Sequence, residues 1–252
     1  MAKPTDLSGK HIMVTGASSG IGKGIAAHLS KMGANLIMVA RNEDRLRETL
    51  KVLEPGDHSY RLLDLNNLDE IEGLFDDVCT QGGKLDGLVH SAGTSLTIPL
   101  QFLKMDDLKN IMSINFYSFI ELVKQYSKKK NNNGGSIVAV SSISSRVGAR
   151  GLAAYCASKG ALESSVRALA LDLAAKNIRI NCVAPGVIDT RIYDDLKEIA
   201  NNKDFVAKLK ERQILGIGNP EDVACAAAFL LSETSRFITG TTLIVDGGYT
   251  AH

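Results

Sequence analysis

Three Tyr-x-x-x-Lys pairs are the residues of this chain whose types and spacing could move a proton: Tyr126/Lys130, Tyr155/Lys159 and Tyr193/Lys197. Residues four apart lie on the same face of a helix. A lysine cation held beside a tyrosine favours the tyrosinate, and it lowers a tyrosine pKa that starts at about 10. Such a tyrosine can give or take a proton near neutral pH.

Position selects the second pair. Tyr155 lies in a long apolar helical stretch that follows a strand ending in two serines, and ligands of a parallel sheet bind at the carboxyl ends of its strands. Ser142 lies 13 residues before Tyr155, and Asn115 lies 40 residues before it. We therefore predict that Tyr155 and Lys159 transfer the proton.

The other two pairs lack these neighbours. Ser113 precedes Tyr126 by 13 residues but falls inside a helical stretch, and Lys130 runs into a polar turn. Tyr193 has Ile180 at the corresponding position and lies in the segment after Pro185. We interpret both pairs as ordinary helix or loop residues.

A glycine-rich turn, Thr15–Gly22, follows the first apolar strand and opens a helix. Glycines at positions 16, 20 and 22 permit a tight turn and a close approach of the backbone to a pyrophosphate. The free N–H groups and the positive dipole of a helix N-terminus then favour the anion. The turn therefore predicts a dinucleotide site.

The residue after the second strand bears on the choice of dinucleotide. An acid about 20 residues beyond the glycines normally binds the ribose 2′-hydroxyl of NAD. Here Ala40 occupies that place and Arg41 follows it. Because an arginine pairs with a 2′-phosphate, we predict NADP(H) in preference to NAD(H).

The elements that must position these residues alternate between short apolar runs and longer helical ones. We expect strands at 10–15, 35–40, 58–63, 85–91, 136–141, 178–183 and 242–245, and helices at 21–32, 42–53, 68–79, 105–129, 153–176, 194–212 and 220–231. Continuous apolar strands separated by helices indicate a parallel sheet covered on both faces. We predict one α/β domain over residues 1–252, with a Rossmann-type doubly wound sheet.

Composition excludes several other classes. The net charge of +1 argues against nucleic acid as the main partner. The four cysteines form no Cys-x-x-Cys pair, so we predict neither a metal site nor a disulfide framework, and we expect a reducing cytoplasm. The longest apolar run, Val223–Leu231, has nine residues against the roughly 20 that a membrane span needs, so we expect no membrane partner.

The spacing Thr-Gly-x-x-x-Gly-x-Gly, together with the Asn115, Ser142, Tyr155 and Lys159 set, resembles the short-chain dehydrogenase/reductase family over essentially the whole chain. The resemblance implies that Tyr155 is the acid in carbonyl reduction and the base in alcohol oxidation. Lys159 would also contact the nicotinamide ribose, Ser142 would donate a hydrogen bond to the substrate oxygen, and Asn115 would hold a water in a proton relay.

The resemblance also implies a cofactor-binding set, in which Asp64 contacts the adenine and 181–186 lies at the nicotinamide end. The set is Gly16, Ser18, Ser19, Gly20, Ile21, Gly22, Arg41, Asp64, Leu65, Ser91, Ala92, Gly93, Tyr155, Lys159, Pro185, Gly186, Ile188 and Thr190. Asp64 could equally be a turn residue. The chain departs from the family at Ser19, where many relatives are basic, and at His90-Ser91, where two asparagines are usual. We interpret His90 as a packed structural histidine.

The resemblance leaves the substrate open. The C-terminal segment 239–248 is similar to 3-oxoacyl-[acyl-carrier-protein] reductases, whose acidic carrier could dock on 128–130. Leu171 and Asp172 replace an Arg-Glu pair that many such reductases carry, which weakens that hypothesis. A hydroxysteroid or a sugar or polyol dehydrogenase stays open, and we expect a substrate lid at about 190–218. Arg146 and Arg150 could attract an anion or could be solvated loop residues.

Two further classes are disfavoured. A non-catalytic cofactor sensor on this fold would usually lose the Tyr or Lys, which are both present, and an epimerase relative would carry Thr-Gly-x-x-Gly-x-x-Gly. The resemblance implies a homotetramer or dimer. The apolar run Ala161–Ala175 suits a second buried surface.

Overall fold

A computed structural model describes residues 5–190 and 211–251. Its seven strands are β1 His11–Thr15, β2 Asn35–Ala40, β3 Ser59–Leu62, β4 Leu85–His90, β5 Asn132–Val140, β6 Ile178–Pro185 and β7 Thr242–Val245. They form one parallel sheet in the order β3-β2-β1-β4-β5-β6-β7. The predicted Rossmann-type α/β domain is confirmed.

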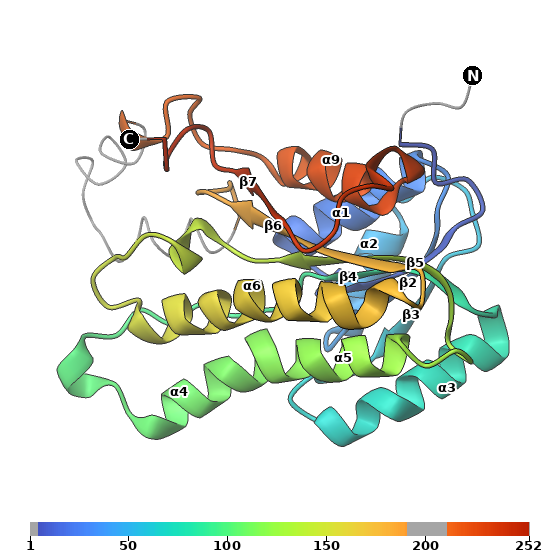
Figure 1. Ribbon diagram of the computed structural model, residues 1–252, viewed down its shortest axis with the longest axis horizontal. Coiled ribbons are helices and arrows are strands. Elements are labelled where there is room, and N and C mark those ends of the chain that lie inside the picture. Colours follow the sequence, from blue (N-terminus) through green and yellow to red (C-terminus); the bar gives the residue numbers. More distant parts are fainter. Residues whose placement is uncertain (1–4, 191–210, 252) are drawn as a thin grey trace.

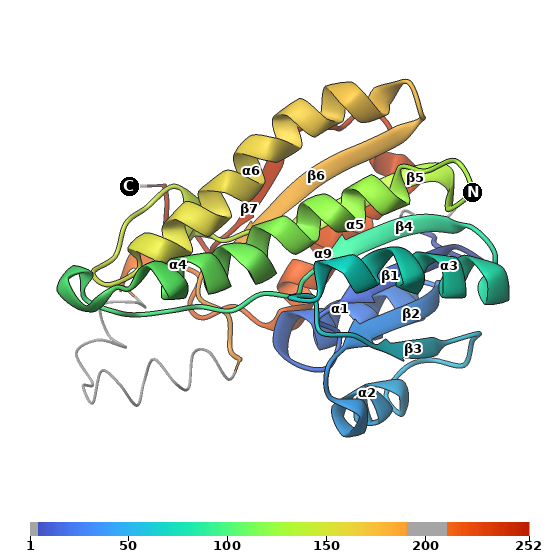
Figure 2. The ribbon, with the colours of Figure 1, turned by 90° about the horizontal axis from the view of Figure 1, so that it is seen from below.

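Helices cover both faces of the sheet (Figures 1 and 2). One layer contains α1 Gly20–Lys31 and α9 Pro220–Leu231, with α2 Glu43–Leu50 beside the β3 edge. The other contains α3 Ile71–Gly82, α4 Met105–Met112, α5 Ser118–Tyr126 and α6 Ala153–Ala174. Each layer buries its own apolar core against the sheet, and the strands contribute side chains to both cores. This explains why the strands are apolar on both faces.

The strand order reverses between β1 and β4, which places a crevice between the loops that follow these strands. Thr15 and His90, the last residues of the two strands, are register partners there. The loop after β1 leads into α1, and the loop after β4 leads toward α4. The fold therefore directs the glycine-rich turn and the 91–93 segment to one place.

Two predicted boundaries are wrong. The strand predicted at 136–141 begins at Asn132, inside a stretch that reads as a polar turn. Asn132 donates side-chain hydrogen bonds to the Tyr126 and Lys128 carbonyls, and Gly134 and Gly135 adopt φ of 90° and 99°. Local polar bonds and left-handed glycines thus let this polar segment enter the sheet.

The helical stretch predicted at 105–129 is interrupted. A π-helical turn, Ser113–Tyr117, separates α4 from α5, and α5 ends at Tyr126. Such turns often occur at functional sites. Asn115 lies in its middle, and its side chain is fully buried.

No helix within residues 5–190 and 211–251 is both long enough and apolar enough to cross a bilayer.

Candidate active site

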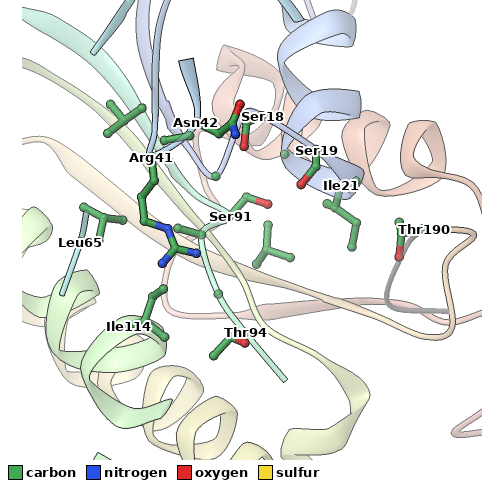
Figure 3. Close-up of a pocket in the computed structure, with 18 of the residues that line it drawn as sticks. Ser18, Ser19, Ile21, Arg41, Asn42, Leu65, Ser91, Thr94, Ile114 and Thr190 are labelled. Carbon is green, nitrogen blue, oxygen red and sulfur yellow. The ribbon is translucent and has the colours of Figure 1, made fainter. Parts of the chain in front are cut away.

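A cleft of about 310 Å³ lies at the carboxyl ends of β1, β2 and β4, at the reversal of strand order. Figure 3 shows the loop residues Ser18 and Ser19 along one side, Arg41 and Leu65 at one end, and Thr190 at the other. Its lining includes predicted cofactor residues from six segments: Gly16, Ser18, Ser19, Gly20, Ile21, Gly22, Arg41, Asp64, Leu65, Ser91, Ala92, Gly93, Tyr155, Lys159 and Thr190.

The glycine-rich turn leaves no room for side chains at two positions. A Cβ on Gly16 would lie 2.7 Å from the Ala92 backbone, and Gly16 has a φ of 69°. A Cβ on Gly22 would lie 2.2 Å from the carbonyl oxygen of Gly16. Backbone packs on backbone here, so the turn keeps its shape and presents main-chain atoms to the cleft.

The N-terminus of α1 faces this cleft. Its N-cap, Ser19, makes no capping hydrogen bond through its side chain, and the first turn of α1 contains no acidic residue. The N–H groups of that turn therefore have no carboxylate competing with an anion. Thr190 lies close by, since a Cβ built on Gly20 would be 3.5 Å from its methyl group.

At the opposite end of the cleft, Arg41 is two-thirds exposed and its Nη1 lies 3.6 Å from Oδ2 of Asp64. Asp64 also accepts a hydrogen bond from the Asn66 N–H at 3.0 Å, so it is a turn residue. Arg45 joins the lining from α2. Two arginines thus face the place where a 2′-phosphate would lie, and one of them is partly balanced by a carboxylate.

Tyr155 and Lys159 line the cleft. The Ser142 side chain lies near enough to the Tyr155 phenol to act on its pKa. Lys159 is 5% exposed, and its Nζ donates to the Val140 carbonyl at 2.8 Å and lies 5.9 Å from the centre of the Tyr155 ring. The Tyr155/Lys159 pair therefore shares one helix face at the end of β5.

Burial controls the proton affinities of this group. Burial raises the pKa of Tyr155 above its ordinary value, and the Ser142 side chain opposes that rise. Burial lowers the pKa of the Lys159 ammonium to about 8, while Cys182 and Glu163 act in the opposite direction. Lys159 is not among the groups that act on the Tyr155 pKa here, so the expected lowering of that pKa by the cation stays a prediction.

Asn115 connects the site to the π-helical turn. Its side chain donates to the Thr94 carbonyl at 2.9 Å and to Ser158 Oγ at 2.9 Å, and it accepts from the Thr94 N–H at 2.8 Å. A Cβ on Gly93 would lie 3.1 Å from Asn115 Oδ1 and 3.4 Å from Lys159 Nζ. The hydrogen-bonding groups of the Asn115 side chain are thus occupied by Thr94 and Ser158. The predicted water would have to bind to the irregular backbone around Asn115.

The remaining predicted residues lie outside the lining. Pro185 ends β6, and a Cβ on Gly186 would lie 2.5 Å from Oε1 of Gln213. The amide of Gln213 also donates to the Val187 and Gly216 carbonyls. Ile188 is buried. The sequence did not predict Gln213, because no neighbouring residue in the sequence indicates that its buried amide binds the backbone of this segment.

The lining also contains residues that the sequence did not indicate as cofactor contacts: Val39, Ala40, Asn42, Arg45, Leu63, Thr94, Ile114, Val140 and Ser141. Most of them flank predicted positions, so a wider window around each motif would have found them. Arg45 could have been found as the basic residue one turn beyond Arg41.

Tyr126 lies at the other end of the sheet. It is fully buried, it donates to the Gly134 carbonyl at 2.7 Å, and burial raises its pKa. Lys128 and Lys130 pair with Glu72 and Asp76, each at 2.6 Å. Residues 128–130 precede β5, whereas Ser142 follows it, so this turn and Ser142 lie at opposite ends of that strand, which disfavours carrier docking there. Tyr193, Lys197 and most of the predicted lid lie outside the described residues.

His90 is a packed histidine, as predicted. It is fully buried, its ring stacks at 5.5 Å on Phe119, and Nδ1 lies 3.1 Å from the Thr15 hydroxyl. Burial, and then the Lys159 charge, lowers its pKa to about 3. The ring is therefore neutral at physiological pH.

These residues fit a nicotinamide dinucleotide. The crowded glycines provide a cradle that any Cβ would fill, the first turn of α1 offers N–H groups, and the cleft continues from Arg41 to Tyr155 and Lys159. One cleft thus contains both the glycine-rich turn and Tyr155.

Comparison with known proteins agrees with this geometry. A family profile described as enoyl-(acyl carrier protein) reductase matches residues 16–250. A 3-oxoacyl-[acyl-carrier-protein] reductase of Rickettsia felis is 37% identical over 96% of this chain and 98% of its own length. A glucose 1-dehydrogenase of Gluconobacter oxydans is 34% identical over 97% and 93%. A short-chain alcohol dehydrogenase structure from Sinorhizobium meliloti superposes with a TM-score of 0.92 and 31% identity, over 98% of this chain and 99% of that one.

Sheet order, glycine-rich turn and these similarities over nearly the whole length lead to one conclusion: the chain belongs to the short-chain dehydrogenase/reductase family and is an oxidoreductase that acts on CH–OH groups.

Proposed function

We propose that this enzyme interconverts a ketone and a secondary alcohol with NADP(H), using Tyr155 as the acid or base. The observation that carries the proposal is that Tyr155 and Lys159 line the same cleft as the glycine-rich turn, with Ser142 near enough to the Tyr155 phenol to act on its pKa. A bound nicotinamide would supply or accept the hydride beside Tyr155.

The chain's own residues handle the proton. Tyr155 keeps its proton at neutral pH because burial raises its pKa, which suits an acid that protonates a developing alkoxide. Ser142 stabilises the same oxygen as negative charge grows on it. Lys159 is close to half protonated near pH 8, so it can return a proton to the tyrosine side of the site. The Asn115 turn orders the water that supplies it.

The preference for NADP(H) rests on Arg41 and Arg45. Both line the cleft at the end of β2, and no carboxylate occupies the position of Ala40. A guanidinium forms a strong charge-assisted pair with a phosphate. The Asp64 carboxylate 3.6 Å from Arg41 is compatible with a preference rather than an absolute requirement.

For the substrate, a 3-oxoacyl thioester is the first candidate, on the strength of the similarity to the Rickettsia felis reductase. A carrier would have to dock elsewhere than residues 128–130, because Lys128 and Lys130 are paired at the far end of the sheet. A sugar or polyol is the second candidate, favoured by a comparable similarity to a glucose 1-dehydrogenase. A hydroxysteroid is a third substrate class to include in the test.

The test is NADPH oxidation against acetoacetyl thioesters, ketoses, ketosteroids and small diketones, with wild type and Tyr155→Phe. We expect turnover of at least one class, and a loss of about 10²–10⁴-fold in kcat for the variant with NADPH binding unchanged. Tyr117→Phe, an exposed tyrosine of the π-helical turn, is the matched control. NADPH binding without turnover in any arm would favour the non-catalytic sensor.

We further propose a cytoplasmic homotetramer or dimer. Leu171 on α6 is 81% exposed and Phe237 is 97% exposed, and a second copy could cover such apolar side chains. A single monomer peak in size-exclusion chromatography would contradict this.

A further inference from the structure

A buried carboxylate lies on the same helix face as the proton-transferring residues. Tyr155, Lys159 and Glu163 follow one another at intervals of four residues on α6, so they share one face. Glu163 is only 6% exposed. Glutamates are almost never this deeply buried unless they are paired, so its partners show what it does.

Both partners of Glu163 come from the turn that follows Ser142. Oε1 lies 2.6 Å from the Ser145 hydroxyl, and Oε2 lies 3.2 Å from Nη2 of Arg146. Ser145 ends the short 3₁₀ turn Ile143–Ser145, and Arg146 caps it. Arg146 therefore pairs with a carboxylate within the fold.

The same turn is tied back to Ser142. The Ser145 hydroxyl lies 2.7 Å from the Ser142 carbonyl oxygen, and the Ser145 N–H donates to that oxygen at 3.0 Å. The Ser142 hydroxyl accepts from the Ser144 N–H at 3.2 Å. The Ser145 hydroxyl has one proton and donates to only one of these two acceptors at a time, but the Ser145 N–H holds the Ser142 carbonyl in either case. Ser145 therefore joins the backbone of Ser142 to the carboxylate of Glu163.

The charge of Glu163 also acts on Lys159. Burial lowers the pKa of that ammonium, and Glu163 is among the groups that raise it. The other ionisable groups facing this cluster are the Cys182 thiol of β6, the Arg146 guanidinium, the Tyr155 phenol and the neutral His90 ring. Burial raises the Cys182 pKa, and His90 and Tyr155 are uncharged at neutral pH. Glu163 is thus the one carboxylate that acts on Lys159 among the described residues.

We propose that Glu163 is a positioning residue for the reaction: it fastens the Ser142 turn to the helix face that carries Tyr155 and Lys159, and its charge supports the Lys159 ammonium. The proposal rests on the proposed function. It has two parts: a structural link, or tie, from Glu163 through Ser145 to the Ser142 turn, and an electrostatic effect of the Glu163 carboxylate on the Lys159 ammonium.

Two substitutions separate these parts. Glu163→Gln keeps an oxygen that can accept from Ser145 but removes the charge. Ser145→Ala keeps the charge but removes the hydroxyl that bridges to the turn. Asp172→Asn removes one carboxylate charge from an exposed position of the same helix and is the matched control.

We expect Glu163→Gln to move the alkaline limb of kcat/KM for ketone reduction downward by about one pH unit. We expect Ser145→Ala to lower kcat about tenfold with the limb in place, because a displaced Ser142 weakens orientation of the substrate oxygen. Asp172→Asn should behave as wild type. An alkaline limb at the wild-type pH in Glu163→Gln, or the same shift in Asp172→Asn, would refute the effect of the Glu163 charge on Lys159. A wild-type kcat in Ser145→Ala would refute the link through Ser145.

NADPH binding followed by fluorescence provides a readout that needs no turnover. The wild-type Kd should weaken as Lys159 loses its proton near pH 8, and this inflection should fall in Glu163→Gln. If wild type reduces no ketone but the inflection moves, the proposed reaction fails and the link between Glu163 and Lys159 stands. If ketones are reduced and the inflection stays, only the link fails. Should Glu163→Gln not fold, Ser145→Ala still decides the tie.

Discussion

His90 should make this protein sensitive to acid. Burial lowers its folded-state pKa from 6.5 to about 3, so on acidification the unfolded chain takes up a proton that the folded chain refuses. The resulting loss of stability is absent above pH 6.5, grows as the pH falls, and stops growing below about pH 3. At pH 5, 1.5 units below the ordinary value, it amounts to about 2 kcal/mol at 1.36 kcal/mol per unit.

The perturbation is His90→Asn, which places at this position the residue usual in the family. Urea unfolding between pH 7.5 and 5, at one protein concentration for both proteins, compares their stabilities under the same conditions of assembly. The variant should have a lower free energy of unfolding than wild type at pH 7.5, because it loses the ring that packs on Phe119. That deficit should shrink by about 2 kcal/mol at pH 5, since asparagine takes up no proton.

Thr15→Val is the companion variant. It removes the hydroxyl 3.1 Å from Nδ1 of His90 but leaves the ring buried. Because burial is the main cause of the lowered pKa, this variant should lose stability by a similar amount at every pH. Parallel pH dependence in wild type and His90→Asn would refute the reasoning, since it would mean that the imidazole does not remain neutral in the fold.

Two further outcomes are expected. Arg41→Ala should raise KM for NADPH roughly 10- to 100-fold, as the loss of a charge-assisted bond of about 1.5–3 kcal/mol implies, with little change for NADH. Arg47→Ala, on α2 and paired with Glu43, should change neither KM, and an equal loss for both cofactors in Arg41→Ala would contradict the assignment. Gly22→Ala should abolish NADPH binding measured by fluorescence, because its Cβ would lie 2.2 Å from the Gly16 carbonyl, whereas Gly73→Ala, with nothing within 4 Å, should bind normally.

Much of the fold could be predicted because both faces of each strand are buried. The runs Asn35–Ala40 and Thr242–Val245 are strands with the predicted bounds, and Pro220 opens a helix that ends at Leu231 as predicted. In these segments the local apolar pattern and the tertiary environment favour the same structure. The position of Tyr155 in the helix after the fifth strand could be predicted for the same reason.

What could not be predicted depends on contacts between distant residues. The π-helical turn at Asn115 changes the hydrogen-bond register without changing the hydrophobic pattern. The raised Tyr155 pKa follows from burial beneath the cleft, whereas a helix-face argument counts only Lys159. The pairing of the buried Glu163 with the more exposed Arg146 joins a turn to a helix, and neither segment alone indicates it.

The strand order also constrains how the chain can fold during synthesis. Ile12 of β1 pairs with Gly87 of β4, and Cys182 of β6 pairs with Thr242 of β7, so one central ladder and one edge ladder close only after long stretches of chain have been made. Such non-local pairing slows folding and leaves apolar strand edges uncovered for a time. A nascent chain that ends before Tyr155 already contains the phosphate-binding turn but lacks the proton-transferring residues. Because a ligand that binds only the folded protein stabilises it, NADPH present during refolding should increase the yield of active protein.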